Sequence, residues 1–188
     1  MALLGIFSAF GLSASAGLNA YIPLLVIALM ARFTNLIKLE SPWDTLTNWW
    51  IIGLLILLSI IEFFADKIPV VNHINDIIQT FIRPTAGAIA FAASANAVTG
   101  IYPILALAMG LLMASTVHVA KAAVVRPTVT VVSAGAGTVP ISIAEDVVST
   151  IVSILSIIVP VVIACILIII TAWIVWRIWR WAKAPNRV

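Results

Sequence analysis

The chain has 188 residues, of which 63% are hydrophobic and only 9% are charged, and its formal net charge is +3. A soluble domain typically carries about 25% charged residues, so a globule this apolar could not cover its surface. Disordered chains are polar and charge-rich, which excludes that class as well. The composition therefore predicts an integral membrane protein that has the lipid bilayer as a partner. The small and scattered positive charge excludes nucleic acid as an expected partner.

Long uncharged runs divide the chain into transmembrane helices, because one span needs about 20 apolar residues. The region 84–120 is too long for one straight crossing and barely long enough for two, so a fifth span stays open. No basic residue precedes Arg32, which favours a retained first helix over a signal peptide. The predicted fold is all-α, a polytopic transmembrane helix bundle that forms a single domain over residues 1–188. Its predicted spans are residues 3–31, 47–66, 85–121 and 143–176.

Basic residues predict the orientation of the bundle in the membrane. The strongest basic cluster lies in the last twelve residues of the chain and consists of Arg177, Arg180, Lys183 and Arg187. Tryptophans interleave with these cations, as expected at a membrane interface. The C-terminus is therefore predicted to be cytoplasmic, and an even number of spans places the N-terminus on the same side.

Proline and amphipathic segments predict that some helices are broken or re-entrant. Residues 70–82 have helical apolar spacing but are too short to span, which predicts a helix that lies in the interface or dips into the membrane. Three of the long uncharged runs contain Pro23, Pro103 or Pro160. Proline frees a backbone carbonyl and kinks a helix. Transporters use such breaks to coordinate substrates, although a kink can also serve packing alone.

A weak internal repeat relates two parts of the chain. Residues 9–29 can be laid on residues 90–110 without gaps. Identical residues fall at Ala9, Phe10, Ser13, Ala14, Ala16, Tyr21 and Leu24 and at their counterparts in the second copy. Internal repeats are typical of transporters, but an alanine-rich composition raises the chance of coincidence. Small residues in 13–17 and 86–95 predict close helix packing, or two stretches that face each other around a narrow pathway.

Charged residues carry the functional prediction, because charges beside or inside a membrane span are unfavourable unless they have a role. The chain has ten basic and seven acidic residues, and five of them fall within residues 62–83. These five are Glu62, Asp66, Lys67, Asp76 and Arg83. The pattern predicts the mouth of a polar cavity, with basic groups for an anion and carboxylates for a cation or proton. The alternative is a set of ion pairs that ties an interfacial helix to the bundle.

Further polar residues extend this predicted pathway. Glu145 and Asp146 precede the last uncharged run, where they either cap a helix dipole or act as buried carboxylates that meet Lys121, Arg126 or the charged residues of 62–83. Asn19 lies in the middle of the first predicted span and either joins the pathway or bridges two helices. Neither metal-ligand spacing nor a nucleotide or nucleophile motif occurs in the sequence. We therefore expect no metal, no cofactor and, on balance, no enzymatic activity.

Several of these residues lie in motifs that resemble a known family. The segments 11–21, 62–69, 80–88, 118–121 and 145–148 together resemble the bacterial integral-membrane family filed as domain of unknown function 4126 (DUF4126). The resemblance implies a compact protein of the bacterial inner (cytoplasmic) membrane. It marks the two charged windows as the family's defining parts but implies no activity.

Two classes of function follow from these expectations. The first is a small transporter or channel for an ion or small polar solute, with the clustered carboxylates and arginine lining its site. Four or five short spans can hardly enclose a wide pathway, so we expect a homo-oligomer. The second is a membrane-embedded enzyme or lipid-phosphate-handling protein, in which carboxylates, His118 and Arg83 act at the interface. A scaffold role is a third and simpler possibility.

Overall fold

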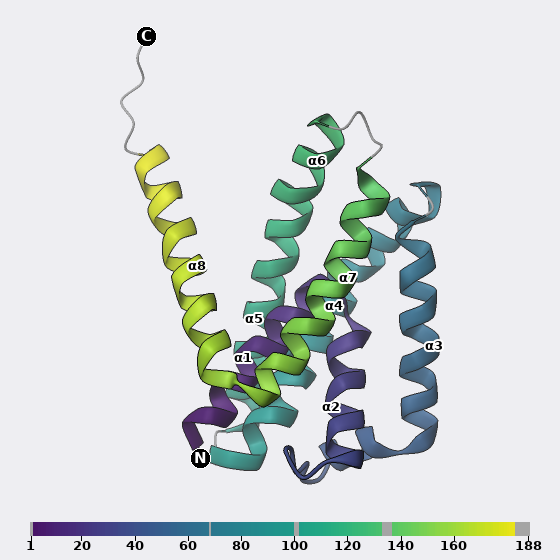
Figure 1. Cartoon of the computed structure of the whole chain (residues 1–188), viewed down its shortest axis with the longest axis vertical. Helices are drawn as coiled ribbons and strands as arrows, with labels where there is room; N and C mark the ends of the chain where they lie inside the picture. Colours follow the sequence, from purple (N-terminus) through teal and green to yellow (C-terminus); the bar gives the residue numbers. More distant parts are fainter. Residues whose placement is uncertain (1, 68, 100–101, 133–136, 183–188) are drawn as a thin grey trace.

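A computed structural model describes all residues except 1, 68, 100–101, 133–136 and 183–188 (Figure 1). The described residues form helices and connecting loops without any strand, which confirms the predicted all-α class. The helices in chain order are α1 (Ala2–Leu18), α2 (Tyr21–Phe33), the short 3-10 helix η1 (Trp43–Thr47), α3 (Trp49–Ala65), α4 (Pro69–Thr99), α5 (Pro103–Ala120), the π-helical turn η2 (Lys121–Val125), α6 (Arg126–Val132), α7 (Thr138–Ile158) and α8 (Pro160–Ala182).

The first two helices form a hairpin. Ser8 of α1 contacts Ser156 near the end of α7, whereas Asn19 contacts Asp146 much earlier in α7, so α1 and α7 are antiparallel. A cavity brings the first residues of α1 together with the loop that follows α2, which places both outer ends of the hairpin at one end of the molecule. Figure 1 shows the N-terminus and the α2–α3 connection at this common end.

The predicted proline kinks are helix starts. Pro103 and Pro160 are the first residues of α5 and α8, and Pro23 lies in the first turn of α2. Proline lacks an N–H group and presets φ, so it fits the first turn, where that N–H has no partner within the helix. The sequence predicted one continuous span in 3–31 and in 143–176, and left open whether 85–121 crosses once or folds back. The structure reverses the chain in all three segments.

The predicted boundary between an interfacial helix over 70–82 and a separate helix after it is also wrong. Both belong to α4, which runs over 31 residues from Pro69 to Thr99 and contains Pro84 in its interior. Proline removes one backbone hydrogen bond of a helix, and tertiary packing can offset that loss. The predicted second span, 47–66, corresponds closely to α3.

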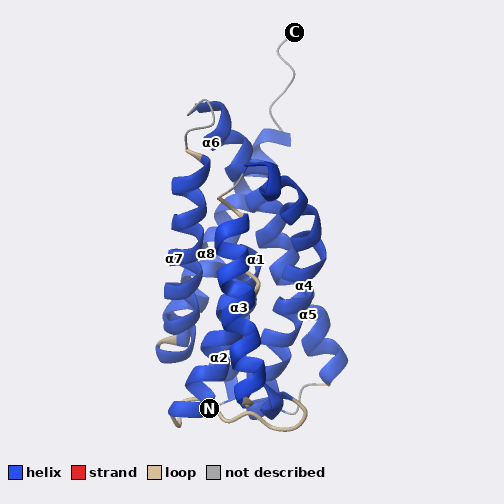
Figure 2. Ribbon diagram, turned by 90° about the vertical axis from the view of Figure 1, so that its right-hand side faces the viewer, coloured by secondary structure: helices blue, strands red, loops and turns tan. Residues whose placement is uncertain are grey.

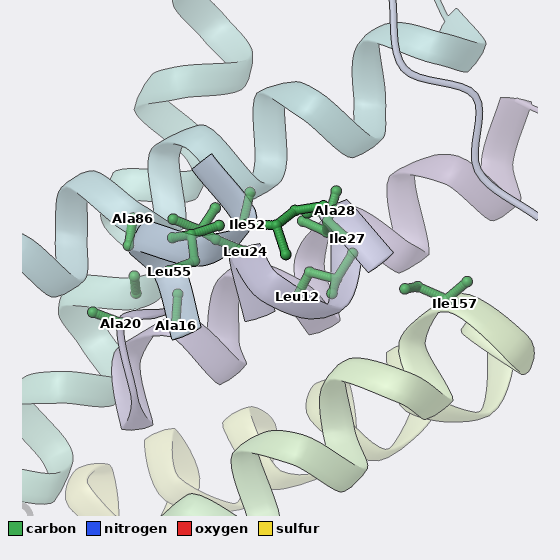
Figure 3. Close-up of a cluster of buried hydrophobic side chains, with 12 residues drawn as sticks. Leu12, Ala16, Ala20, Leu24, Ile27, Ala28, Ile52, Leu55, Ala86 and Ile157 are labelled. Atoms are coloured by element: carbon green, nitrogen blue, oxygen red, sulfur yellow. The ribbon is translucent and has the colours of Figure 1, made fainter. Parts of the chain in front are cut away.

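Helix α1 is the centre of the bundle, between α7 on one side and α4 and α5 on the other (Figure 2). Buried apolar side chains from α1, α2 and α3 gather around it, with Ala86 of α4 and Ile157 of α7 at the edges (Figure 3). Helix α5 approaches α1 very closely, because a Cβ atom at Gly17 of α1 would collide with the carbonyl oxygen of Ala114, and α4 approaches α5 as closely at Gly87. Small residues therefore set the distances between the central helices.

Large apolar side chains cover much of the outer surface. Two helical stretches in the described part are long and apolar enough to cross a membrane, Pro103–Val129 and Val139–Ile158. Shorter apolar stretches occupy 4–18, 21–33 and 49–65. The predicted count of four spans stays a prediction.

Candidate functional site

Eight charged side chains meet beside the turn of the α1–α2 hairpin. They come from the end of α3, from α4, from the α5–η2–α6 junction and from α7. Four are acidic and four are basic, so their formal charges cancel, as expected for charges taken out of water. We name this group the charge cluster: Glu62, Asp66, Lys67, Arg83, Lys121, Arg126, Glu145 and Asp146.

The pair of Glu62 and Arg83 is the most deeply buried part of the charge cluster, and neither side chain is exposed. An Arg83 Nη2 atom lies 3.0 Å from Oε1 of Glu62 and 3.6 Å from Oδ2 of Asp66. Glu62 and Asp66 are four residues apart and share one face at the end of α3, so one arginine reaches both. The backbone N–H of Ala20 donates to Oε2 of Glu62 at 3.2 Å. Glu62 thereby also neutralises the positive end of α2.

A second group of ion pairs surrounds the end of α1. Nζ of Lys121 lies 2.8 Å from Oε2 of Glu145 and donates to the carbonyl oxygen of Leu18 at 2.9 Å. The ammonium group therefore neutralises the negative end of α1. Arg126 reaches the same Glu145 oxygen at 3.4 Å and Asp66 at 3.2 Å, so it joins the two groups of ion pairs. The wide π-helical turn over 121–125 brings Lys121 and Arg126 to one carboxylate.

Asn19 connects the hairpin turn to the charge cluster. Its Oδ1 accepts hydrogen bonds from the backbone N–H groups of Tyr21 and Ile22, both at 3.1 Å, and so holds the start of α2. Its Nδ2 donates to Oδ1 of Asp146 at 3.0 Å. The other oxygen of Asp146 pairs with Lys67 at 3.3 Å. One uncharged side chain thus caps a helix and positions a buried carboxylate.

The structure brings together most of the residues that the sequence singled out. Asn19 and seven of the eight predicted charged residues lie in or against the charge cluster, and the side chain of the eighth, Asp76, lies outside the described part. Glu145 is the eighth residue of α7, well beyond its first turn, so the helix-capping interpretation of Glu145 and Asp146 is wrong.

Sequence reasoning missed two members of this region. The sequence offered Arg126 only as a possible partner of Glu145 and Asp146 and not as a site residue. Its position in the charge cluster depends on the π-helical turn before it, which the sequence pattern did not predict. Asn75 donates to Oδ1 of Asp66 at 2.7 Å. It lies eight residues before Arg83 on the same face of α4, and this helical spacing could have indicated its role.

Several buried polar atoms near the charge cluster have no hydrogen-bond partner among the described residues. They are Oε1 of Gln79, Nε of Arg83, Oγ of Ser142 and Oε1 of Glu145. Buried polar groups normally have partners, so such atoms indicate sites for water or for a ligand. Within the described residues, no group of three or more His, Cys, Asp or Glu side chains could hold a metal ion.

Comparison with known proteins supports the resemblance noted in the sequence. Residues 6–180 match the family model described as domain of unknown function (DUF4126). Neither the curated proteins nor the solved structures contain a match. The match names no reaction and no substrate, so the geometry of the charge cluster is the remaining guide to function.

Proposed function

We propose that this chain, which belongs to the family of domain of unknown function DUF4126, is a small transporter for an ion or small polar solute. We place it in the bacterial inner membrane. The observation that carries the proposal is the turn of the α1–α2 hairpin, which lies inside the charge cluster. Transporters place the ends of broken helices at a substrate site, where free backbone groups and helix dipoles contact polar solutes. Here Ala20 and Leu18 present such groups to charged side chains.

The outer surface supports a place in the bilayer. Large apolar side chains are exposed along α3 and α8, and soluble proteins rarely expose contiguous patches of this kind. Helix α1 has 17 residues and is therefore about 25 Å long, somewhat short of a hydrocarbon core of about 30 Å. We infer that the α1–α2 hairpin enters the membrane from one side, turns inside it and returns to the same side. Tryptophans favour the membrane interface, and Trp49 begins α3. Glu62 lies 13 residues further along α3, about 20 Å from Trp49, a depth inside a hydrocarbon core of about 30 Å.

The arrangement of the two hairpins supports transport as well. The repeat in the sequence lays the break after Leu18 on the break after Thr99, and these breaks separate α1 from α2 and α4 from α5. The two hairpins point in opposite directions, because α1 and α4 are antiparallel: Ser13 lies beside Gly87, whereas the earlier Phe10 meets the later Phe91. Phe10 and Phe91, which match in the repeat, contact each other edge to face at 5.0 Å where α1 crosses α4. Inverted repeats of this kind are common in transporters.

The enclosure of the charge cluster favours transport over catalysis on a lipid. An enzyme that acts on lipid headgroups needs a site open towards the membrane. Glu62 and Arg83 are instead fully enclosed by protein, and Lys121 is almost so. An enclosed site that opens by conformational change is the arrangement that transport requires.

The test is solute flux through the purified protein in vesicles of phosphatidylethanolamine and phosphatidylglycerol. Wild-type protein is assayed with a panel of H⁺, Na⁺, K⁺, Cl⁻ and small polar solutes. Glu62→Gln keeps the shape of the side chain but removes the charge that faces Arg83 and Ala20. We expect it to lower the flux of the transported solute at least tenfold.

Glu40→Gln is the matched control, because Glu40 is an exposed glutamate in the loop before η1. It should transport at the wild-type rate. A folded Glu62→Gln protein with unchanged flux would count against the proposal, and so would a wild-type protein that moves nothing in the panel.

A further inference from the structure

Serine side chains line the contact between α1 and α7. Oγ of Ser15 lies 2.8 Å from Oγ of Ser149 and 2.6 Å from Oγ of Ser153. About two turns closer to the N-terminus of α1, Oγ of Ser8 donates to the carbonyl oxygen of Ser156 at 2.6 Å. We name these five residues the hydroxyl seam. Four of them, all except Ser8, are fully buried.

The hydroxyl seam leads from the charge cluster to a cavity at the other end of the molecule. Its upper end lies one turn below Asp146, where Asn19 donates to the carboxylate. Its lower end is Ser8, which lines a cavity of about 480 Å³ together with Ser94 of α4, residues 35–38 and the α7–α8 turn. Asp146 and Ser156 are ten residues apart on α7, which corresponds to about 15 Å. The seam thus crosses half of the bundle.

Packing alone does not explain so many hydroxyl groups. The opposite side of α1 packs on α4 and α5 mainly through alanine and glycine, with Ser13 bonded to the carbonyl oxygen of Gly110, and no hydroxyl–hydroxyl contact occurs there among the described residues. A buried hydroxyl group is unfavourable unless it is hydrogen-bonded. The seam hydroxyls bond backbone carbonyls as well as one another: Ser15 and Ser149 each donate to the carbonyl oxygen of the other. The positions of α7 that face α1 are Ser149, Ser153 and Ser156.

Unpartnered atoms at the upper end of the same helix indicate that a further group binds there. Oγ of Ser142 and Oε1 of Glu145 are buried and have no hydrogen-bond partner among the described residues. Ser142 is four residues before Asp146 and seven before Ser149, on one face of α7. The polar face of α7 therefore ends in open hydrogen-bonding positions beside the charge cluster.

We infer that the hydroxyl seam conducts protons between the cavity and the charge cluster, so that the proton is the ion that the proposed transporter moves or couples to. The inference rests on the proposed function and identifies the ion. Hydroxyl oxygens 2.6–2.8 Å apart leave no space for a metal ion or a hydrated ion. A proton needs no such space, because each of the touching hydroxyls of Ser15, Ser149 and Ser153 accepts a proton on its oxygen and passes its own proton to the next hydroxyl.

The proton ends on a carboxylate of the charge cluster. Asp146 faces Asn19 from the hairpin turn and Lys67 from the end of α3, with Glu145 beside it on α7. When Asp146 accepts the proton its charge is lost, and its ion pair with Lys67 weakens. Beyond Ser153 the hydroxyl contacts end, because the Ser156 hydroxyl donates to the carbonyl oxygen of Val152 and Ser8 meets the carbonyl oxygen of Ser156, so the proposed path to the cavity at Ser8 is completed by water. No bond other than O–H bonds is made or broken.

The test measures proton flux in sealed vesicles of phosphatidylethanolamine and phosphatidylglycerol that contain a pH-sensitive dye. An imposed pH gradient drives the flux, and valinomycin with K⁺ prevents a charge build-up. Ser15→Ala removes the hydroxyl that contacts both Ser149 and Ser153. We expect it to lower proton flux at least tenfold, and Ser153→Ala to lower it severalfold.

Ser13→Ala is the matched control. Ser13 is also fully buried on α1, but its hydroxyl donates to the carbonyl oxygen of Gly110 on the other face. Its proton flux should stay within twofold of wild type. Folded Ser15→Ala and Ser153→Ala proteins with wild-type proton flux would overturn the inference. Transport of another ion or solute without protons would overturn it and leave the proposed function standing, whereas a wild-type protein that moves nothing would overturn both.

Discussion

Helix α1 has two faces that use small residues for different purposes. On one face the hydroxyl of Ser13 donates to the backbone of Gly110, and glycines let α4 and α5 approach to backbone contact. On the other face, two residues later, Ser15 meets the hydroxyls of Ser149 and Ser153. On the first face the small size of the side chains is what matters, because it lets the helices approach. On the second face the side chains are equally small, but their hydroxyl groups also form hydrogen bonds. A composition rich in alanine, glycine and serine does not distinguish them.

The two faces should respond differently to substitution. The glycine face has no free space, so an added methyl group there displaces a backbone. The hydroxyl seam satisfies its own polar atoms, so loss of one hydroxyl changes hydrogen bonding and leaves the helix spacing intact. Substitutions that change volume and substitutions that change polarity can therefore separate the two roles.

The largest effect is expected where α4 and α5 contact each other beside the glycine face of α1. In Gly110→Val, the new Cβ would collide with the carbonyl oxygen of Gly87 and with Phe91, so α4 and α5 must separate. We expect a loss of about 3 kcal/mol in the free energy of unfolding, the upper end for overpacking in a tight core. Unfolding in mixed detergent micelles measures it.

Gly53→Ala is the control for this substitution, because a Cβ at Gly53 on α3 would contact nothing within 4 Å. Alanine favours a helix over glycine, so stability should rise by about 0.5–1 kcal/mol. A Gly110→Val protein as stable as wild type would show that α4 and α5 can separate without loss.

A smaller effect is expected where the two faces of α1 end, at Asn19. Asn19→Ala removes the hydrogen bonds to the start of α2 and leaves Asp146 without its amide donor. We expect a loss of about 2–3 kcal/mol, because a cap and a buried hydrogen bond to a charged group are lost together. Asn48→Ala is the control, since Asn48 caps α3 through Trp50 on an exposed surface. It should lose about 1 kcal/mol, and equal losses in both variants would mean that the contact with Asp146 contributes nothing.

Sequence patterns could predict the helical class and most of the charge cluster, because both follow from the energetics of burial. Few charges can be buried, and those that are buried must meet partners of opposite sign. The sequence placed Glu62, Asp66 and Arg83 in one window and offered ion pairs as one of two alternatives, and in the structure Arg83 lies against both carboxylates. The identity of each partner depended on packing. Arg126 reaches Glu145 only because a π-helical turn changes the direction of its side chain.

The helix ends inside the long uncharged runs could not be predicted, because the hydropathy of a segment does not show where the chain turns back. The turns of the hairpins consist of small or apolar residues, so an uncharged run continues across them without a visible change. Asn19 and Ala20 reverse the chain in the middle of such a run. Pro23, Pro103 and Pro160 marked the right places, but a proline in the first turn of a helix and one in a kink look the same in a sequence.

The smallest effect on stability should come from the hydroxyl seam itself. Ser13→Ala and Ser15→Ala should each lose about 1 kcal/mol, the usual contribution of one hydrogen bond. When all partners are replaced by apolar groups of similar size, no hydroxyl is left unsatisfied, and such replacements are nearly neutral. The triple variant of Ser15, Ser149 and Ser153 to alanine should therefore unfold within about 1 kcal/mol of wild type. It copies the composition of the opposite face of α1, yet it should conduct no protons. A large loss of stability would show instead that the serines hold α1 against α7.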